Sequence, residues 1–509
     1  MPMFERISHI DGIISEQEIL FSTKFDYMFP DVAHSRLCLL PSSTDTVAAL
    51  KALGQAIGTP GDTLAAPGDS AIPAIFTYFG QFIDHDITAR TDRDDIALTF
   101  LGRAEPIAPL DPDIVVAKLH NGRRPQLDLD NVFGDAPAFA GSGPTAAQSE
   151  SQQLFESDYR LKVYASGSRR DVPRDDDCVA IIPDMRNDEN INISQLQCAF
   201  LNFYNRIRAG QPNPASDAQK HIRARTLTRW AYQYVVVHDY LKTVCDPDVV
   251  EDTLANGPRY FGATAGHADA YMPLEFSTAA FRFGHSMIRP SYNLNATTQN
   301  VGLDKILGPG KQSTKSFYFD AGQHQIKQAV VIDFEFYARG GAHLQFARKI
   351  DSQIAHGLDT LPLAGRDDPV LSNLAKSNLL RGYNLSVPTA QGICDAMGLY
   401  PLTTAELIGG EVPAIADVLS STYLDRRTPL WYYILREAAV QQDGQRLGEL
   451  GSRLVCETII GMLKGDPNSY LNNRHDPDVK SDGIDVKPGA GGKIQTLVDM
   501  LNFAQVASI

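Results

Sequence analysis

Four polar side chains interrupt an otherwise apolar stretch, residues 72–87: Gln81, Asp84, His85 and Asp86. The phenylalanines around them recur at helical spacing, so we predict a helix that places Gln81 and His85 one turn apart on one face. Imidazole gains and loses protons near neutral pH, which makes His85 a candidate general base. The alternative is a polar patch that faces water, because two carboxylates and an imidazole are costly to bury.

A second histidine, His285, lies alone in the apolar segment AAFRFGHSMIRP, where we predict a helix over residues 277–288. A lone histidine in such a helix is usually a core residue, but helical imidazole is also the common axial ligand of haem iron. Arg282, three residues earlier, could meet an acidic cofactor edge such as a haem propionate. Asn378, near Arg381 in SNLLRGYN, could bind the other ring nitrogen of His285 or simply belong to a helix end.

Two further motifs could belong to a functional site or could be solvent-exposed surface residues. Arg186, in DMRNDEN, directly precedes a predicted helix over residues 193–208 and could stabilise a developing anion, or be a surface charge. Asp128 and Asp130 alternate in RRPQLDLDNVFG. Several hard oxygens close together suit Ca²⁺, although no EF-hand spacing is present and a solvated turn would look the same.

The elements that must position these residues are predicted to be mainly helical, with few strands. Further helices are expected over residues 226–241, 370–380, 389–397, 430–440 and 447–463. Residues 329–337 have the best strand pattern. Residues 215–224 are expected to be solvated, and residues 103–180 to form an irregular excursion over the surface.

The bulk composition excludes several classes of protein. The 509-residue chain is 43% hydrophobic with a net charge of −15, which suits a soluble enzyme and disfavours binding to nucleic acid. We expect no transmembrane helix, because no apolar run is long enough. The six cysteines are scattered without a CxxC pair, which indicates free thiols in a reducing compartment. No secretory signal is visible, so we expect a cytoplasmic protein or export by a non-classical route.

The segment GQFIDHD resembles the distal-helix signature of the animal-type haem peroxidases, the group that contains myeloperoxidase, lactoperoxidase and the cyclooxygenases. Other segments resemble this family in the same order: FDYMFPD, RRPQLDLDNVFG, RNDENINISQLQCAFLNFYNR, FRFGHSMI, NLLRGYNLSVP and DPNSYL. The likeness is greatest to short bacterial members. It implies a mainly α fold with haem between a distal and a proximal helix. The expected domains are an N-terminal arm (1–24), a haem peroxidase domain (25–475) and a C-terminal tail packed on it (476–509).

The resemblance assigns a role to each candidate residue. On the distal side it makes His85 the histidine, Gln81 its partner and Arg186 the arginine. It makes His285 the proximal iron ligand and Asn378 the hydrogen-bond partner of His285. The implied cofactor is haem b, bound also by the residues Arg282, Arg381, Asp84 and Glu189. The last two match the carboxylates that form esters to haem methyl groups.

Calcium is the second implied cofactor. The resemblance places it on the side chains of Asp86, Asp128 and Asp130 and on the backbone carbonyls of Arg124 and Gln126. Arg124 departs from the family pattern, in which a threonine is usual at this position. Asp130 falls where animal relatives have a serine ligand.

The implied activity is that of a haem peroxidase, which uses H₂O₂ to oxidise small organic donors or halides through a ferryl intermediate. Two alternatives remain. A haem-dependent fatty-acid dioxygenase would need an oxidisable tyrosine beside the haem, and Arg282 stands where cyclooxygenases have theirs. Asn190 likewise stands where myeloperoxidase has a methionine bonded to haem, which excludes that link. A non-catalytic adhesion protein on a peroxidase fold would not need His85, Arg186 and His285 together.

Overall fold

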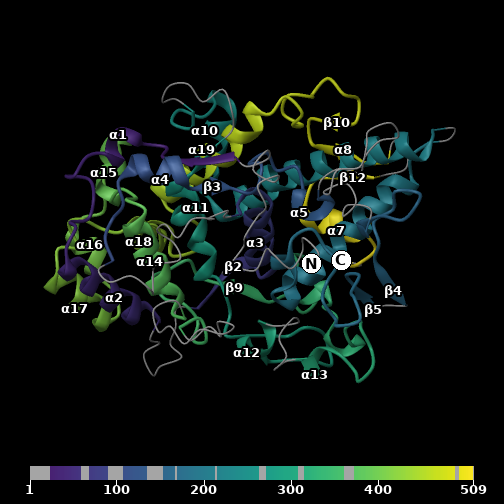
Figure 1. The fold of residues 1–509 in the computed structure, drawn as a ribbon, viewed down its shortest axis with the longest axis horizontal. Helices are drawn as coiled ribbons and strands as arrows, with labels where there is room; N and C mark the ends of the chain where they lie inside the picture. The colour runs from purple at the N-terminus through teal and green to yellow at the C-terminus, as the bar shows by residue number, and fades with distance from the viewer. Residues whose placement is uncertain are drawn as a thin grey trace.

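Helices dominate the part of the chain that the computed structural model describes (Figure 1). That part comprises residues 23–58, 68–89, 107–134, 153–166, 169–212, 215–262, 271–307, 315–359, 372–487, 492–507 and 509. Most of the expected arm, residues 1–22, lies outside it. The mainly α fold class predicted from the sequence is confirmed.

Helix α3, Ile75–Ile87, runs through the middle of the molecule (Figure 1). It packs on a group of helices and turns with these bounds: α5 Asp130–Phe133, η3 Met185–Asp188, α7 Ile191–Ala209, α8 Asp217–Val235 and the π-helical turn η4 Val236–Leu241. Aromatic rings fill the contact: Phe82 of α3 stacks on Phe200 of α7 with centroids 4.4 Å apart. Gly80 allows the close approach of Tyr240, because a Cβ there would lie 2.4 Å from its hydroxyl.

A second group of helices lies on the other side of α3 (Figure 1). Its members are α2 Thr44–Gly58, α14 Leu374–Asn384, α15 Ala390–Met397, α16 Thr404–Ile408, α17 Pro413–Ser421 and α18 Leu430–Gln442. Helices α10, Pro247–Asn256, and α19, Glu449–Gly465, pack on each other, and α19 also packs on α18. Short helices complete the set: α1 Pro30–Ala33, α4 Pro112–Lys118, α9 Lys242–Val244, α12 Leu303–Ile306 and α13 Lys315–Tyr318.

The segment that carries His285 is not the single α-helix predicted over residues 277–288. Helix α11, Leu274–Thr278, ends at Ala279, and the 3₁₀ segment η5, Ala280–His285, follows. One reason is that Arg282 Nε donates to the Ser277 carbonyl at 2.9 Å, which is the carbonyl that a continuing α-helix would use. Residues three apart share one side of a 3₁₀ helix, so Arg282 and His285 still face the same way.

Strands are few and short in the described residues. The sheets have the orders β3-β1-β6, β10-β11-β12, β2-β9, β4-β5 and β7-β8. Their bounds are β1 Thr23–Asp26, β2 Asp69–Pro73, β3 His120–Asn121, β4 Tyr164–Ser166, β5 Arg169–Asp171, β6 Met272–Pro273, β7 Ser291–Tyr292, β8 Val301–Gly302, β9 Phe346–Arg348, β10 Val479–Lys480, β11 Gly483–Asp485 and β12 Lys493–Ile494. Strand β1 pairs antiparallel with β3 and parallel with β6.

The strand predicted over residues 329–337 is wrong. The segment contains two 3₁₀ turns, η6 Gln328–Val330 and η7 Phe334–Phe336. Some of its backbone groups bind side chains: the Asn295 amide donates to the carbonyls of residues 329 and 331, and Asp333 caps η7. Others make isolated backbone contacts, such as the Asp333 N–H, which donates to the Leu294 carbonyl at 2.8 Å. An alternating pattern of apolar residues cannot distinguish these two arrangements.

Two other sequence expectations hold only in part. Residues 215–224 are not simply solvated, because α8 begins at Asp217 with a capping box formed by Ser216 and Gln219, and His221 is buried. Residues 103–180 do not only cross the surface, because the stretch from Leu127 to Phe133 contains fully buried apolar side chains. All six cysteines are free, as predicted, and five are buried.

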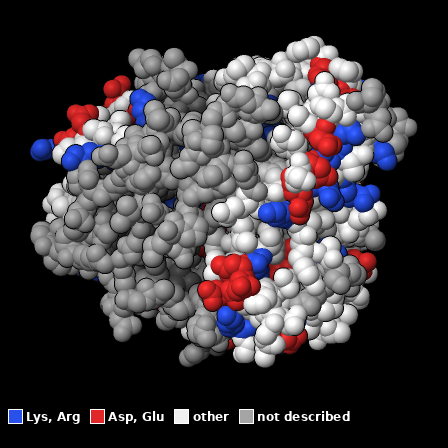
Figure 2. Space-filling view, turned by 45° about the vertical axis from the view of Figure 1, so that its right-hand side comes forward, with Lys and Arg blue, Asp and Glu red and all other residues white. Residues whose placement is uncertain are grey.

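The C-terminal segment packs on α7 and α8. Helix α20, Leu497–Phe503, places the Phe503 ring 5.5 Å from that of Phe203, and Arg223 of α8 forms ion pairs with Asp476 and Asp478. On the face shown in Figure 2, acidic and basic side chains lie close to one another over the described surface. Among the described residues, no helix has the length and apolar character that crossing a membrane requires.

Candidate active site

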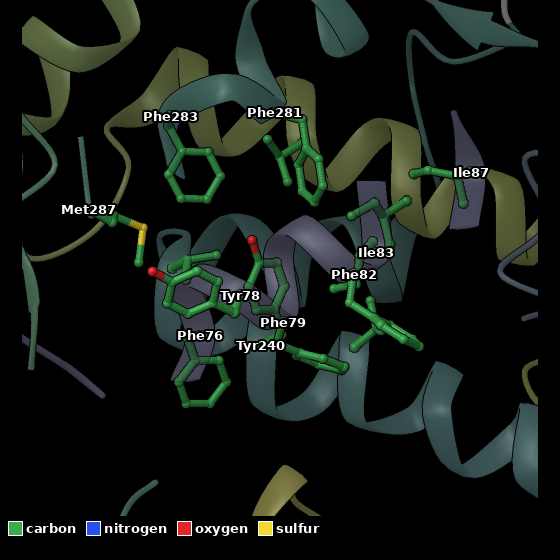
Figure 3. Close-up of a cluster of buried hydrophobic side chains, with 14 of the residues drawn as sticks. Phe76, Tyr78, Phe79, Phe82, Ile83, Ile87, Tyr240, Phe281, Phe283 and Met287 are labelled. Atoms are coloured by element: carbon green, nitrogen blue, oxygen red, sulfur yellow. The ribbon is translucent and has the colours of Figure 1, made fainter. Parts of the chain in front are cut away.

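Helix α3 exposes only two of its side chains to a solvent-accessible space. Gln81 and Asp84 are partly exposed, whereas the other residues of the helix are buried, including His85 at 3% exposure. Figure 3 shows why: Phe79, Phe82 and Ile83 lie in a cluster of rings with Phe281 of η5. In a helix this deeply buried, residual exposure of two polar residues means that they line an internal space.

Arg186 is held against the end of α3 by backbone and carboxylate oxygens. Its Nη2 donates to the carbonyls of His85 and Thr88 at 3.0 and 2.7 Å and to the Asp184 carboxylate at 2.6 Å. Arg123 Nη2 donates to the same carboxylate at 2.7 Å. Burial raises the pKa of Asp184, but the charges of Arg186 and Arg123 outweigh burial and hold this pKa well below its usual value. Asp184 therefore fixes Arg186 beside His85.

Neutral amides surround the inner ring nitrogen of His85. Its Nδ1 lies 2.8 Å from Oδ1 of Asn187, whose Nδ2 donates to Oε1 of Gln197 at 2.8 Å. Gln197 Nε2 donates to the carbonyl of Asn131 at 3.1 Å. The Asn131 amide in turn donates to the carbonyl of Phe82 at 3.0 Å. Asn187, Gln197 and Asn131 had no role in the sequence predictions. Polar residues in segments such as RND, SQLQC and LDN are common, so the sequence carries no signal that could have revealed them.

Gln81 and Asp84 meet different partners along the exposed side of α3. Gln81 donates to the Glu189 carboxylate and accepts from Asn190 Nδ2 at 3.1 Å. Asn190 also caps α7 by accepting from the Ile193 N–H. Burial raises the pKa of Asp84, while the charges of Arg282 and Arg186 lower it. Asp84 therefore lies within electrostatic reach of both η5 and η3, and α3 packs on both of these segments, so the distal and proximal segments are neighbours.

The proximal side is built around His285. Its Nδ1 lies 2.8 Å from Nδ2 of Asn378 on α14, and the charges of Arg282 and Arg381 act on the ring. Burial, with these two cations, lowers the pKa of His285 to about 3, so the imidazole is neutral at ordinary pH. Asn378 Oδ1 is buried without a hydrogen-bond partner. Exchanging the amide O and N would let this oxygen accept from Nδ1–H and leave Nε2 with the lone pair that a metal ligand needs.

These residues fit haem. A neutral histidine with an oriented inner nitrogen suits axial ligation, and Arg282 with Arg381 supplies cations for propionates. A Cβ at Gly284, next to His285, would meet no atom within 4 Å, so there is room beside the ligand. Asp84 and Glu189 lie at the same space, where a haem edge would meet them.

The residues assigned to calcium include buried oxygens without partners. Both carboxylate oxygens of Asp86 and one each of Asp128 and Asp130 are buried without a hydrogen bond. Burial, then Asp130, raises the pKa of Asp128 to about 7, and burial with both neighbouring carboxylates raises that of Asp86 well above its usual value. Among the described residues, no set of three or more His, Cys, Asp or Glu side chains has the arrangement of a formed metal site.

The two carbonyls expected to complete that site already accept hydrogen bonds. The Arg124 carbonyl accepts from the Gln126 N–H at 2.9 Å, and the Gln126 carbonyl accepts from Gln233 Nε2 at 3.2 Å. The Arg124 side chain approaches the carboxylates instead, with Nε 3.9 Å from Asp130 Oδ2. Since a carbonyl has two lone pairs, both remain able to bind a cation.

Comparison with known proteins identifies the family. The family model described as animal haem peroxidase matches residues 143–479, more than half of the chain, so the chain belongs to the animal haem peroxidase family. The matched stretch contains Arg186, Glu189, His285 and Asn378, and α3 precedes it. No curated protein matches the chain in sequence.

Solved structures share the fold at low sequence identity. Peroxidase A from Dictyostelium discoideum is similar with a TM-score of 0.61 and 17% identity, over 96% of this chain and 94% of that one. A fatty acid alpha-dioxygenase from Arabidopsis thaliana is similar with a TM-score of 0.56 and 14% identity, over 90% and 73%. The corresponding Oryza sativa enzyme gives 0.57 and 14%, over 95% and 77%.

Proposed function

We propose that this protein is a haem peroxidase that uses H₂O₂ to oxidise small organic donors or halides. The observation that carries the proposal is the pairing of a buried base with a largely buried cation: Arg186 donates to the backbone carbonyl of His85 at 3.0 Å. His285 of η5 contacts Asn378, and η5 packs on α3. Heterolysis of a peroxide needs a base and a cation on one side, and a supported metal ligand on the other.

Each residue would perform one task. Haem, when bound, would supply the iron that binds the peroxide and the two electrons that reduce its O–O bond. His85 accepts the proton of the incoming peroxide and returns it to the oxygen that leaves. Arg186 stabilises the negative charge that builds on that oxygen, with the positive charge of a guanidinium group that Asp184 orients. Asn378 orients His285 so that Nε2 faces the cofactor.

The first test is spectroscopic and is followed by a screen of electron donors. The purified protein with haem should show a Soret band and should oxidise guaiacol or iodide when H₂O₂ is added. Arg186→Leu should slow this reaction by roughly 10²–10³-fold, the usual cost of removing one group that stabilises a developing charge. A wild-type protein that binds haem but oxidises no donor with H₂O₂ would contradict the proposal.

We also propose that calcium joins α3 to the loop before α5. The support is the set of buried, unpartnered oxygens on Asp86, Asp128 and Asp130. A divalent cation would relieve their mutual repulsion and stabilise the fold by mass action. Elemental analysis should find calcium, and a strong chelator should lower the melting temperature. The absence of calcium, together with unchanged melting in the chelator, would contradict this proposal.

A fatty-acid dioxygenase is the second candidate, because solved enzymes of that name share the fold. It would need a tyrosine to carry a radical, and η5 offers Arg282 three residues before His285. Tyr383 is a candidate substitute, since it lines a small cavity together with Asn378. Rapid O₂ uptake with linoleate, abolished by Tyr383→Phe, would favour this candidate. We expect little uptake.

A further inference from the structure

A directional chain of hydrogen bonds ends on the inner nitrogen of His85. We call it the amide chain; its members are the side chains of Asn187 and Gln197 and the backbone carbonyl of Asn131. His85 is 3% exposed, and the other three residues are fully buried. Water therefore cannot replace a member, and each amide must satisfy its neighbours directly.

The direction of the chain follows from its far end. A carbonyl oxygen can only accept, so the group of Gln197 that faces Asn131 must be the NH₂ group. The Gln197 oxygen then faces Asn187 and accepts from its NH₂ group. The Asn187 oxygen is left facing Nδ1 of His85, which must therefore carry a hydrogen. The orientation of both amides thus follows from the acceptor at the end of the chain, the Asn131 carbonyl, and does not depend on an assumed tautomer of His85.

The far end is itself anchored to α3. The Asn131 side chain donates to the carbonyl of Phe82, three residues before His85, so the hydrogen bonds run from α3 through η3, α7 and α5 and back to α3. The Phe82 carbonyl also can only accept, which fixes the Asn131 amide in the same way. The hydrogen bonds that orient the His85 ring therefore begin and end on the same helix, α3.

We propose that Asn187 and Gln197 are positioning residues that hold His85 in the Nδ1–H tautomer, so that Nε2 is the proton acceptor in the active site. This inference rests on the proposed peroxidase function. When Nε2 takes the peroxide proton, Nδ1 keeps its hydrogen and Asn187 continues to accept it, so the chain need not reorganise. When Nε2 returns the proton to the leaving oxygen, the starting tautomer is restored.

The test measures cyanide binding as well as turnover. Hydrogen cyanide must give its proton to a distal base as the anion binds ferric haem, and the shift of the Soret band reports the rate. Asn187→Leu and Gln197→Leu should slow both cyanide binding and the reaction with H₂O₂ by roughly 10–100-fold, the usual effect of removing a partner that orients a histidine. Haem content measured on each variant separates this effect from loss of the cofactor.

The chain offers a matched control and a conservative rescue. Gln195, two residues before Gln197, is also buried on α7 and donates to a backbone carbonyl, that of Arg170, at 3.1 Å. Gln195→Leu should leave both rates unchanged. Gln197→Glu keeps the oxygen that faces Asn187 and, as a neutral acid, offers an O–H to Asn131, so it should recover most of the rate lost in Gln197→Leu.

Two results would overturn the inference: wild-type cyanide binding in Asn187→Leu, or equal slowing in Gln195→Leu and Gln197→Leu. If Asn187→Leu does not take up haem, Asn187→Ser replaces it, because the shorter hydroxyl withdraws the acceptor without adding bulk, and the same slowing is expected. Failure of the proposed function looks different, since the wild-type protein itself would then bind cyanide yet oxidise no donor.

Discussion

Replacing Asp184 with Asn should both destabilise the protein and slow its reaction with peroxide. Asp184 is fully buried and accepts from Arg186 Nη2 at 2.6 Å and from Arg123 Nη2 at 2.7 Å. Asn keeps the shape of the side chain but removes the negative charge between two cations. Breaking a buried ion pair from one side costs about 3–5 kcal/mol, because the remaining charge stays buried without compensation.

The size of the melting shift follows from chain length. A cooperative unit of 509 residues has an unfolding entropy of roughly 1 kcal/mol per kelvin, at about 2 cal/mol/K per residue. The loss of unfolding free energy in Asp184→Asn therefore corresponds to a decrease in melting temperature of ~3–5 °C. Arg186 would keep its bonds to the carbonyls of His85 and Thr88 but lose the carboxylate that aligns it. A displacement of this kind should lower the rate constant for H₂O₂ by about 10²-fold.

Differential scanning fluorimetry and stopped-flow absorbance at the Soret band measure the two effects. The control is Asp171→Asn, because Asp171 is equally buried and accepts from Arg174 Nε at 2.9 Å without touching Arg186. We expect Asp171→Asn to melt early but to react with H₂O₂ at the wild-type rate. If Asp184→Asn reacts at the wild-type rate, then Asp184 does not position Arg186 for the reaction, and the reasoning is wrong.

Three further predictions concern the cofactor and the pH dependence of stability. His285→Ala should lose the Soret band, and a wild-type spectrum would exclude His285 as the iron ligand. After peroxide treatment, acidified butanone should leave haem on the wild-type protein and extract it from the double variant of Asp84→Ala and Glu189→Ala; complete extraction from both would exclude esters. Burial raises the pKa of Glu437 to about 7, so the folded protein keeps a proton that the unfolded chain, with its ordinary value of 4.5, has lost. Stability should fall as pH rises between these values, by on the order of 3 kcal/mol for this group, and Glu437→Gln should reduce the slope in unfolding experiments at pH 5 and 7.5.

The sequence predicts this fold best where a helix has regular apolar spacing and clear ends. Helix α7, Ile191–Ala209, extends the predicted 193–208 by two residues at the start and one at the end, because Asn190 caps it and arginines occupy its last turn. The helix predicted around His285 is wrong in type, because a contact between Arg282 and the Ser277 carbonyl competes with the regular ladder. Such a contact depends on tertiary packing and leaves no trace in periodicity.

The candidate site also has residues that the sequence reveals and residues that it does not. His85, Arg186 and His285 can be found because their residue types stand out in apolar or family-specific segments. The side chains that orient them cannot be found from the sequence, because Asp184 and Gln197 resemble any other acidic or polar residue. Their roles arise only when η3, α5 and α7 pack on α3. The sequence therefore identifies the groups that would do the chemistry, while the structure identifies the groups that hold them.

His85 is held by hydrogen bonds between neutral groups and Arg186 by an ion pair, so pH and salt act differently on the two residues. The amides that bind His85 carry no net charge, so neither acid nor salt changes their strength to first order. Arg186 is held by two backbone carbonyls and by an ion pair with Asp184. Salt screens such a buried pair much less than an exposed one, and the lowered pKa of Asp184 keeps its carboxylate charged where an ordinary aspartate takes up a proton. Strong acid would thus weaken the contact that aligns Arg186, through protonation of Asp184, and would leave the contacts that orient His85 unchanged.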